Sequence, residues 1–595
     1  MKKLFTGNEA IARGAYEAGV CFASAYPGTP STEILQNLAG YDEILAEWAP
    51  NEKVSLEAVI GASLGGVRAI CSMKHVGLNV AADPYFTFAY TGVNAGVVII
   101  TADEPGQHSS QNEQDNRWYA LSGKVPMYEP ASSQECLEMV KEAFELSEQY
   151  DTPVLLRLTT RVCHSKGVVN CSDRVPFEVK PYVKDADKFV MVPSNAISRR
   201  AFVEKRMQEL AEFTDKSKRN YIEKGGITGV VASGVCRHYA KEVFGGEATY
   251  LHLGFTNPLP GKLLDEFSKL VDEMYIIEEN DPFLQNWVKS QGHGSKVKTV
   301  FPPSGELTPD VLRVSLGKPS LPVIKTDADN VLGRPPTLCA GCPHRGFFYE
   351  LAKRKNICIT GDIGCYTLGF TQPFNAMDSC ICMGGAFSIG HGFSQAQKIS
   401  GGDIRTVGIL GDSTFFHMGI NSLIEVVYNN SKTVCVILDN CITAMTGGQQ
   451  HPGTGKTAKG DAVPVMDIAT IVRAIGIKLL IEVNPNDLKA VSNALDEALV
   501  FDGPSVILTK WPCVLKRLDD DERNLYGNPF SKKLHVNENC IGCRLCIKCG
   551  CPAISMQKNK DGAMPKSFIN AVQCVGCEVC AQICPKKAIE EAKNG

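Results

Sequence analysis

Short apolar runs alternate with longer segments of helical periodicity along most of the chain. Near the N-terminus, Val20–Tyr26, Ala69–Met73 and Gly96–Thr101 have the pattern of buried strands, and Asn51–Gly66 has the pattern of a helix between two of them. Buried strands that alternate with helices are typical of a parallel sheet covered by helices on both faces. We therefore predict an α/β doubly wound fold, with a first domain over residues 1–185.

The same alternation returns in a second, smaller α/β unit, which we place at residues 186–325. Its candidate strands are Gly229–Ala232, Tyr250–Leu253 and Met274–Glu278, which are short apolar runs bounded by turn residues. The charged stretch Glu204–Lys224 is expected to connect the first unit to these strands.

A third α/β unit is predicted over residues 335–518, after a stretch rich in proline. It contains the apolar runs Thr406–Leu410 and Thr433–Leu438 with a helix-like segment between them, which is the pattern of a βαβ unit. The polar stretch Asp519–Lys533 then leads to a cysteine-rich domain at residues 531–595.

Composition and charge narrow the class of protein. The chain has 595 residues, of which 44% are hydrophobic and 21% are charged, and its formal net charge is −4. This balance is that of a globular protein, and the lack of a basic block gives no indication of nucleic-acid binding. Met1–Phe5 is followed at once by polar residues, unlike a secretory signal, and apolar runs such as Val97–Ile100 are too short to span a bilayer. We expect a cytoplasmic protein that does not act on a membrane.

Cysteine is concentrated at the end of the chain. Of 24 cysteines, nine lie between Cys540 and Cys584. Cytosolic thiols stay reduced, so clustered cysteines there indicate metal or redox chemistry rather than disulfides. Two runs carry the pattern, and they are Cys540, Cys543, Cys546, Cys551-Pro552 and Cys574, Cys577, Cys580, Cys584-Pro585.

The second run has the spacing of bacterial ferredoxins, in which the cysteine before proline binds the other cluster. On this rule we predict two 4Fe–4S clusters, held by Cys540, Cys543, Cys546 and Cys584 and by Cys574, Cys577, Cys580 and Cys551. The first run has four residues instead of three before its Cys-Pro, and its extra thiol, Cys549, could replace Cys551 as a ligand. A pair of zinc sites is the alternative, but such sites rarely use three cysteines in tandem. The domain therefore predicts electron transfer.

A polar residue follows each of two neighbouring strands in the third unit. Asp412 comes shortly after Thr406–Leu410, and Asn440 comes shortly after Thr433–Leu438. The carboxyl ends of neighbouring parallel strands meet at the edge where such sheets bind ligands. Carboxylate and amide oxygens suit a hard cation, although an aspartate in this position is more often a turn or cap residue.

Several segments together resemble the large (alpha) subunit of indolepyruvate:ferredoxin oxidoreductase, within the 2-oxoacid:ferredoxin oxidoreductase superfamily. They are Gly7–Ala10, Tyr26–Thr32, Cys339–Arg345, Gly361–Tyr366 and Gly411–Phe416. The resemblance spans nearly the whole chain. It implies, in chain order, a thiamine pyrimidine-binding domain, a small transketolase C-terminal-like domain, a thiamine diphosphate-binding domain and a ferredoxin-type domain with two clusters.

The resemblance implies that the third unit holds thiamine diphosphate through Mg²⁺. The corresponding residues are Gly411, Asp412, Ser413, Asn440, the backbone carbonyl of Ile442, and Thr446 in a loop beside the cofactor. Ser413 departs from the glycine that is usual in this motif.

Two residues of the first unit would act with the cofactor. The resemblance implies a helical glutamate against the pyrimidine ring, and we choose Glu57, because its small apolar neighbours suggest close packing. A solvated surface glutamate is the alternative reading. Thr29, in the turn Tyr26–Ser31, would donate a hydrogen bond to the substrate, although a proline-bounded turn needs no function to exist.

Four further cysteines correspond to those that surround a third cluster in related pyruvate and 2-oxoglutarate enzymes. They are Cys339, Cys342, Cys365 and Cys513. A zinc site or plain buried thiols are the alternatives, and the spacing cannot show that the four converge. We therefore expect two clusters and leave the third open.

The resemblance implies ferredoxin-dependent oxidative decarboxylation of aryl 2-oxoacids to aryl-acetyl-coenzyme A and CO₂. A smaller beta subunit, ferredoxin and coenzyme A would be the partners. Another 2-oxoacid, such as pyruvate or a branched-chain acid, is an alternative substrate, because pocket shape decides the choice. A non-catalytic electron-transfer subunit is the alternative of another class, and the presence of Asp412, Asn440 and Glu57 argues against it.

Overall fold

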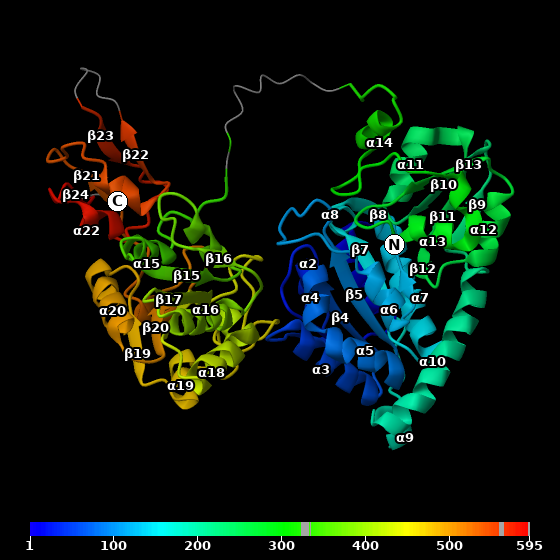
Figure 1. Cartoon of the computed structure of the whole chain (residues 1–595), viewed down its shortest axis with the longest axis horizontal. Helices are drawn as coiled ribbons and strands as arrows, with labels where there is room; N and C mark the ends of the chain where they lie inside the picture. Colours follow the sequence, from blue (N-terminus) through cyan, green and yellow to red (C-terminus); the bar gives the residue numbers. More distant parts are fainter. Residues whose placement is uncertain (323–332, 334, 558–563, 593–595) are drawn as a thin grey trace. The chain divides into compact units, whose positions relative to one another are not determined.

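The chain folds into two compact units, Met1–Thr326 and Asp327–Gly595 (Figure 1). The computed structural model describes residues 1–322, 333, 335–557 and 564–592. The expected boundary at residue 325 lies outside the described residues. Both units are built from parallel sheets with helices, so the predicted α/β class is confirmed.

The first unit is organised around a seven-stranded sheet. In spatial order its strands are β12 (Phe255–Asn257), β6 (Met127–Tyr128), β7 (Val154–Thr159), β5 (Val97–Asp103), β4 (Ala69–Lys74), β2 (Phe22–Ala25) and β3 (Leu45–Trp48). All neighbours pair in parallel except β12 with β6. The strands predicted near the N-terminus are therefore present, and their carboxyl ends share one edge.

Helices cover both faces of this sheet. Alternate residues of β5 enter two different cores, with Val98 and Ile100 in one and Val97 and Ile99 in the other, as expected when successive side chains of a strand point to opposite faces. The helices of this domain are α1 (Gly7–Glu17), α2 (Thr32–Leu38), α3 (Glu52–Leu64), α4 (His75–Val80), α5 (Ala82–Thr91), α6 (Arg117–Gly123), α7 (Ser133–Gln149) and α8 (Thr160–His164). A two-stranded sheet of β1 (Lys2–Thr6) and β8 (Lys166–Asn170) lies beside them.

The rest of the first unit has its own five-stranded sheet. The strands, in order, are β14 (Val297–Lys298), β13 (Glu273–Ile277), β10 (Thr228–Ser233), β11 (Ala248–Leu253) and β9 (Asn220–Glu223). The accompanying helices are α9 (Ala186–Phe189), α10 (Pro193–Thr214), α11 (Cys236–Phe244), α12 (Gly261–Ser268), α13 (Phe283–Val288) and α14 (Pro309–Ser315). The stretch 204–224, expected as a connector, instead contains the end of the long helix α10 and strand β9, because Val203, Arg206 and Leu210 give α10 a buried stripe.

The second unit contains a six-stranded parallel sheet. Its strands, in order, are β16 (Ser379–Cys380), β15 (Ile357–Gly361), β17 (Arg405–Gly411), β18 (Thr433–Asp439), β20 (Ser505–Lys510) and β19 (Leu479–Val483). The main helices are α15 (His344–Leu351), α16 (Ala386–Ser400), α17 (Asp412–Thr414), α18 (Ile420–Tyr428), α19 (Ile468–Ile475) and α20 (Leu488–Val500). β17 and β18 are parallel neighbours, with Gly411 opposite Leu438, as the βαβ pattern predicts.

The C-terminal part of this unit has two small antiparallel ladders. β21 (Leu534–Val536) pairs with β24 (Ile589–Glu591), and β22 (Ile554–Gln557) pairs with β23 (Lys566–Ile569). α21 (Asp520–Leu525) lies in the predicted polar linker, and α22 (Val579–Ile583) lies within the cysteine-rich region. No helix in the described part of the chain combines the length and the apolar character of a membrane span.

Candidate functional site

The candidate cofactor site of the second unit lies at the carboxyl edge of its sheet. Asp412 follows β17 directly, and Asn440 follows β18 directly. Both side chains are buried, with 3% of Asp412 and 8% of Asn440 exposed. The parallel pairing of the two strands therefore brings together two polar residues that are distant in the sequence.

One backbone amide joins these two side chains. The N–H of Ile442 lies 3.2 Å from Oδ2 of Asp412 and 3.3 Å from Oδ1 of Asn440. The other oxygen of Asp412 accepts a hydrogen bond of 2.7 Å from the Ser413 amide. A carboxylate oxygen and an amide oxygen thus face one point, and oxygen donors of this kind are those that Mg²⁺ prefers. The residues present fit a cation that carries a diphosphate.

Two further groups set the charge of this site. Burial, followed by the nearby Asp412 charge, raises the pKa of Asp439 to about 6. Burial alone would also raise the pKa of Asp412, but the His451 imidazole, with Nε2 at 3.1 Å from Oδ2, holds it below its usual value. His344, whose pKa burial lowers to about 4, is uncharged near neutral pH, and its Nε2 lies 3.4 Å from Nδ2 of Asn440. The site therefore carries negative charge that a bound cation would neutralise.

A third buried carboxylate shapes the neighbouring loop. Asp362 follows β15, and its oxygens accept hydrogen bonds from the amides of Gly384 at 2.8 Å and Ala386 at 2.9 Å. Burial raises the pKa of Asp362 to about 6. These contacts fix the loop that enters helix α16, at the same sheet edge as Asp412.

The remaining residues expected around the cofactor lie in the same region. Ser413 is buried, and its Oγ accepts a hydrogen bond of 3.0 Å from the Thr443 hydroxyl. Thr446 is half-buried, and its backbone carbonyl accepts a hydrogen bond of 2.8 Å from the Gln449 side-chain amide, which closes the loop on itself. The role expected of Thr446 stays a prediction, whereas Ser413 is part of the packed site.

Glu57 in the first unit does not have the surroundings that its neighbours suggested. The prediction of close packing is wrong, because the Glu57 side chain is 45% exposed and forms an ion pair with Lys53 one turn earlier on α3. The small residues Gly61 and Ala62 are not fully buried either. The role of Glu57 toward a cofactor stays a prediction.

The buried carboxylate of helix α3 is instead Glu52, its first residue. Asn51 caps the helix by accepting a hydrogen bond of 2.9 Å from the Val54 amide, and this leaves Glu52 at the carboxyl edge of the sheet with 6% of its surface exposed. A side chain at Gly77 would begin 2.8 Å from Cγ and Oε1 of Glu52. Glycine at this position therefore allows helix α4 to approach the carboxylate closely.

The turn Tyr26–Ser31 leaves the same edge, after β2. Its backbone is tied by Nδ2 of Asn8, which donates to the Pro30 carbonyl at 2.8 Å, and by the Ser31 hydroxyl, which donates to the Gly28 carbonyl at 2.9 Å. Thr29 is half-buried. Thr29 and Glu52 therefore lie at one edge of the first sheet, whereas the Glu57 side chain is exposed to solvent.

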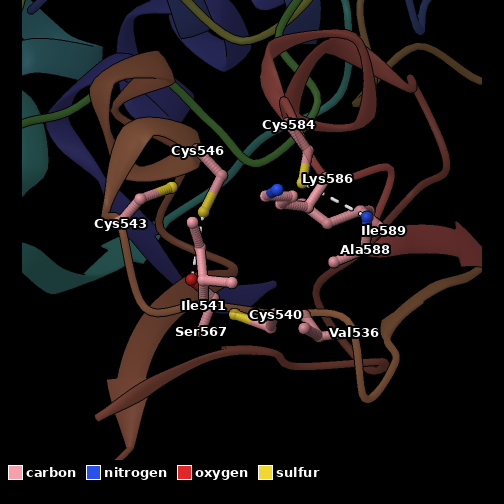
Figure 2. A pocket seen from close by; sticks show the side chains of 10 residues that line it. All are labelled: Val536, Cys540, Ile541, Cys543, Cys546, Ser567, Cys584, Lys586, Ala588 and Ile589. Carbon is pink, nitrogen blue, oxygen red and sulfur yellow. Dashed lines mark hydrogen bonds between the residues drawn. The ribbon is translucent and has the colours of Figure 1, made fainter. Parts of the chain in front are cut away.

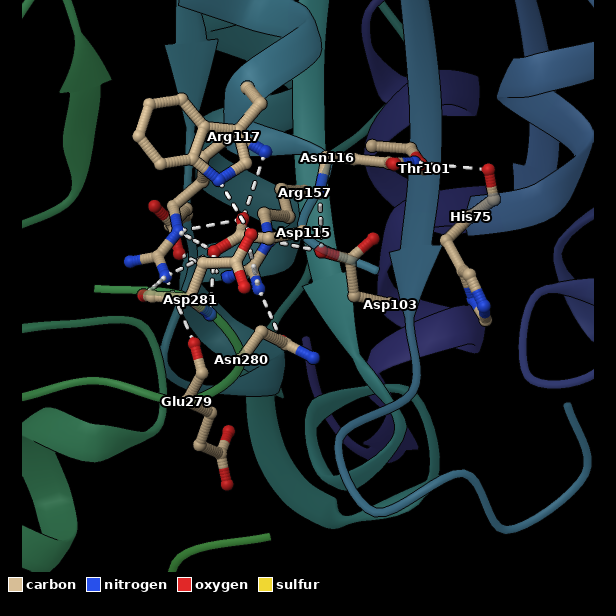
Figure 3. A network of polar contacts seen from close by, with 12 residues as sticks. His75, Thr101, Asp103, Asp115, Asn116, Arg117, Arg157, Glu279, Asn280 and Asp281 are labelled. Atoms are coloured by element: carbon tan, nitrogen blue, oxygen red, sulfur yellow. Dashed lines mark hydrogen bonds and ion pairs between the residues drawn. The ribbon is translucent and has the colours of Figure 1, made fainter. Parts of the chain in front are cut away.

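A second polar region in the first unit is filled by internal ion pairs (Figure 3). The guanidinium of Arg157 contacts Asp103 at 2.6 Å and Glu129 at 2.7 Å, and its third nitrogen donates to Oδ1 of Asn280 at 2.9 Å. Arg117 likewise pairs with Asp115 and with Glu278. The network ties the seven-stranded sheet to the loop after β13, so it holds the smaller sheet in place.

The four cysteines assigned to the first tail cluster line one pocket (Figure 2). Cys540, Cys543, Cys546 and Cys584 surround it together with Val536, Ile541, Ser567, Lys586, Ala588 and Ile589. Cys543 is exposed. Across the described residues, no three His, Cys, Asp or Glu side chains converge closely enough to share a single metal ion.

The cysteines assigned to the second tail cluster also gather, and Cys549 lies among them. Burial, followed by the charges of Cys551 and Cys574, raises the pKa of Cys577 to about 11. Burial and then the nearby Cys551 raise the pKa of Cys549 to about 12. Arg345 of α15 donates to the backbone carbonyls of Cys549 at 3.2 Å and Gly550 at 2.5 Å. Both Cys549 and Cys551 are near the other three thiols, so the choice between them stays open.

The four remaining candidate cysteines lie close together, which the sequence could not show. Burial, followed by the charges of Cys513 and Cys339, raises the pKa of Cys365 to about 11. Burial and then Cys365 and Cys513 act in the same direction on the buried Cys342. Asp412 adds to the raised pKa of both Cys365 and Cys513. This group of thiols is therefore next to the candidate cofactor site.

This cysteine group also touches the second tail cluster region. Gly341, between Cys339 and Cys342, has φ of +69°, and a side chain there would begin 2.0 Å from a methyl group of Val575. The loop around Cys339 thus packs directly against the loop that carries Cys574 and Cys577. In the second unit, this group of thiols therefore neighbours both the candidate cofactor site, where the Cys513 amide donates to the Asn440 carbonyl at 3.0 Å, and the loop that carries Cys574 and Cys577.

Several residues of the site were missed by sequence reasoning. Glu52, Lys74 and Asp362 each lie at a strand end or helix start on the ligand edge, as Asp412 does, and that placement was a usable signal. His451 lies in a loop and gave no such signal. Its approach to Asp412 depends on the folding of residues 441–451, in which Thr443 pairs with Gln449.

Comparison with known proteins places these sites in context. Residues 13–218 match the family "pyruvate flavodoxin/ferredoxin oxidoreductase, thiamine diP-bdg", and residues 362–508 match "thiamine pyrophosphate enzyme, C-terminal TPP binding domain". The chain is 41% identical to indolepyruvate oxidoreductase subunit IorA of Methanothermobacter thermautotrophicus, over 100% of this chain and 98% of that protein. It is 35% identical to the subunit of the same name in Pyrococcus horikoshii, over 100% and 97% of the two chains.

A solved structure is also similar. It is 2-oxoglutarate:ferredoxin oxidoreductase from Magnetococcus marinus with 2-oxoglutarate, coenzyme A and succinyl-CoA bound. The match has a TM-score of 0.46 and 16% identity, and it covers 53% of this chain and 65% of that one.

Proposed function

The chain belongs to the family of indolepyruvate oxidoreductase subunits IorA, and from this premise we propose that it is the thiamine-dependent subunit of an indolepyruvate:ferredoxin oxidoreductase. Its reaction is ferredoxin-dependent oxidative decarboxylation of a 2-oxoacid, and the finer proposal is that an aryl 2-oxoacid gives aryl-acetyl-coenzyme A and CO₂. We assign residues 1–185 to the pyrimidine-binding domain, 186–325 to the small domain, 335–518 to the diphosphate-binding domain and 531–595 to the two-cluster domain.

The observation that carries this proposal is the convergence of Asp412 and Asn440 on the amide of Ile442. Asp412, Asn440 and the carbonyl of Ile442 would hold Mg²⁺ and, through it, the diphosphate. His451 would keep Asp412 ionised, and the amide–imidazole contact of 3.4 Å between Asn440 and His344 would orient the Asn440 oxygen toward the ion. A preformed set of oxygen ligands lowers the cost of ordering the site when the ion binds.

Thiamine diphosphate, when bound, supplies a carbanion that adds to the ketone of a 2-oxoacid and takes up the electrons released with CO₂. The chain's own residues would position the cofactor, exclude water and accept a proton. We propose Glu52 rather than Glu57 as the carboxylate that hydrogen-bonds the pyrimidine ring. Glu52 is 6% exposed and lies at the carboxyl edge of the sheet, where parallel sheets bind ligands, whereas the Glu57 side chain is 45% exposed and pairs with Lys53.

The thiols would carry the electrons away. We propose that Cys339, Cys342, Cys365 and Cys513 hold a third 4Fe–4S cluster beside Asp412, in addition to the two clusters of the tail. The contact of Gly341 with Val575 and the hydrogen bonds from Arg345 to the loop at Cys549 support a short path from this group to the second tail cluster. Electron transfer would then leave through the cluster at Cys543, which is exposed.

The partners follow from the same proposal. A smaller beta subunit would complete the enzyme, ferredoxin would accept the electrons, and coenzyme A would accept the acyl group. We propose a cytoplasmic location, in line with the reduced state that cluster-forming thiols require.

The test is anaerobic co-expression with the beta subunit, followed by iron analysis and dye reduction with a panel of 2-oxoacids. We expect about twelve irons per chain for three clusters, against about eight for the tail alone. Indolepyruvate and phenylpyruvate should support coenzyme A-dependent reduction. Reduction with pyruvate or 2-oxoglutarate alone would contradict the aryl substrate, and reduction with none of them would contradict catalysis by this chain.

Two matched variants of α3 test the assignment within the first unit. Glu52→Gln should lower kcat by about 10²- to 10⁴-fold, because that range is typical for loss of a catalytic acid or base. Glu57→Gln on the next turn should stay within about twofold of wild type. The reverse result would return the role to Glu57.

A further inference from the structure

We propose that Lys74, which packs beside the turn that carries the expected donor Thr29, binds the carboxylate of the 2-oxoacid. This inference rests on the proposed function, and it attributes the preference of the enzyme for a substrate with a carboxylate to the ammonium group of Lys74.

Lys74 lies at the carboxyl edge of the seven-stranded sheet, beside the turn where we expect the substrate. It is the last residue of β4, and β4 pairs in parallel with β2, whose carboxyl end leads into the turn. A side chain at Gly28 would begin 3.3 Å from Cγ and Cδ of Lys74. The aliphatic stem of Lys74 therefore packs on the turn at Gly28, the residue immediately before the proposed donor Thr29.

The ammonium group is buried but only loosely bound. The Lys74 side chain is 12% exposed, and its Nζ lies 3.6 Å from Oε2 of Glu104 and 3.3 Å from the Ser109 carbonyl. An ammonium carries three N–H groups, whereas the described residues supply these two partners at distances longer than the 2.7–2.9 Å typical of a charged pair. Lys74 could therefore donate a hydrogen bond to a ligand oxygen without breaking a short ion pair.

Glu104 does not depend on Lys74 for its hydrogen bonds. The Ser109 hydroxyl donates to Oε1 of Glu104 at 2.7 Å, and the Ser110 hydroxyl donates to Oε2. Burial would raise the pKa of Glu104, but these hydroxyls, together with Lys74, hold it below its usual value. Because Glu104 has its own donors, Lys74 can be shared with an incoming carboxylate.

The turn beside Lys74 is held in place before any ligand arrives. Asn8 and the Ser31 hydroxyl bind its carbonyls, and Nε2 of His164 lies 3.3 Å from the Pro30 carbonyl. A fixed turn next to a partly desolvated cation is a preorganised anion site, in which a charged hydrogen bond is stronger than in water. The ligand class that fits is a small organic carboxylate, here the carboxylate of a 2-oxoacid.

The alternative is that Lys74 only neutralises Glu104. The two readings differ in which constants change when the amine is removed. A substrate anchor affects the KM and affinity for 2-oxoacids alone, whereas a structural lysine affects coenzyme A, folding stability and uncharged ligands as well.

The experiment uses the assembled enzyme with its beta subunit. In Lys74→Met, we expect KM for phenylpyruvate, and its dissociation constant by calorimetry on thiamine-free protein, to rise by about 10- to 100-fold, the usual loss for a hydrogen bond to a charged group. KM for coenzyme A should stay within about twofold. Inhibition by phenylacetone, in which a methyl group replaces the carboxylate, should be unchanged.

Three further variants keep the result interpretable. Lys74→Met/Glu104→Gln removes the carboxylate that the single change could leave unpaired, and it should show the same loss of phenylpyruvate affinity. Lys74→Arg keeps the charge and should recover part of the affinity. Lys218→Met, which removes an exposed lysine paired with Glu142 at 2.9 Å in the same unit, should behave as wild type.

The possible outcomes separate this inference from the proposed function. If wild type reduces dye with phenylpyruvate and Lys74→Met does so with unchanged KM, the assignment of Lys74 is overturned while the function stands. Equal losses for phenylpyruvate, coenzyme A and phenylacetone would also overturn it, because they indicate a structural lysine. If wild type neither binds nor oxidises any 2-oxoacid, the proposed function itself fails.

Discussion

The molecule contains two groups of buried carboxylates, and their negative charge is compensated in different ways. In the first unit, the carboxylates of Asp103, Asp115, Glu129 and Glu278 pair with the guanidinium groups of Arg117 and Arg157, with contacts as short as 2.5 Å. Figure 3 shows Asp103 and Asp115 beside the two arginines. In the described part of the second unit, neither Asp412 nor Asp439 pairs with a guanidinium group. Asp412 instead contacts His451 at 3.1 Å, and Lys510 lies 3.7 Å from Asp439.

The difference is consistent with a structural role for the first group and with the cation site that we propose for the second. Burying a carboxylate is costly unless a partner compensates its charge. The arginines of the first unit supply that compensation from within the chain and join two sheets. The carboxylates of the second unit are compensated only in part, at a sheet edge with converging oxygen ligands, and a divalent cation would complete them.

Breaking the arginine pairs should have the largest effect on stability. Arg157→Met leaves Asp103 and Glu129 buried without their cation, so we expect a loss of about 3–5 kcal/mol in the free energy of unfolding of the first unit. Chemical denaturation measures it. Arg161→Met is the matched control, because Arg161 is 52% exposed where it pairs with Glu306, and its loss should stay below about 1 kcal/mol. Equal effects would contradict the structural role of the network.

Removing Asp412 should weaken cofactor binding strongly but change the stability of the protein little. Asp412→Ala is expected to weaken Mg²⁺-dependent thiamine diphosphate binding by at least about 100-fold, since even loss of a residue behind a metal ligand costs 10- to 100-fold. Calorimetry with the cofactor and Mg²⁺ measures the change. Stability without cofactor should fall by less than about 1 kcal/mol, because the change also removes charge repulsion with Asp439. Full cofactor affinity in this variant would contradict the site.

Protonation of Glu279 should make the stability of the first unit depend on pH. Burial raises the pKa of Glu279 from its ordinary 4.5 to about 7, because the hydrogen bond from the Leu307 amide and the charges of the two arginines offset the cost of burial only in part. Folding then favours the protonated form, so this stabilisation is complete below pH 4.5 and is lost as the pH rises through 7.

The matching variant is Glu279→Gln, which stays uncharged at every pH. We expect it to be more stable than wild type at pH 8, by about 1–3 kcal/mol, and equal to wild type within error at pH 4. Urea denaturation at the two pH values measures this difference. A constant offset at both pH values would show that Glu279 does not titrate in this range.

Removal of an exposed ion pair should have the smallest effect on the free energy of unfolding. Lys432 pairs with Asp502 on the surface of the second unit, where the side chains are 61% and 82% exposed. Lys432→Met should change the free energy of unfolding by no more than about 0.5 kcal/mol, because solvent and salt screen such a pair. A loss above about 1 kcal/mol would mean that exposure is a poor guide to the strength of ion pairs in this protein.

Fold class and part of the site could be read from the sequence alone. Apolar runs such as Thr406–Leu410 determined the strands, and the polar residues just after them, Asp412 and Asn440, determined the ligand edge, because parallel strands bring their carboxyl ends together. The cysteine spacing likewise grouped Cys540, Cys543, Cys546 and Cys584, which line one pocket. Local pattern suffices where a regular element fixes the position of the next one.

Only the tertiary structure decided which polar residues are buried. Glu52 and Glu57 lie on the same helix, yet the cap at Asn51 and the approach of Gly77 bury the first and leave the second in solvent. The convergence of Cys339 with Cys365 and Cys513, and of His451 with Asp412, depends on loops whose course no periodic pattern encodes. Burial and loop closure arise from packing between distant segments, so the surroundings of these residues were set by the fold and not by their neighbours in sequence.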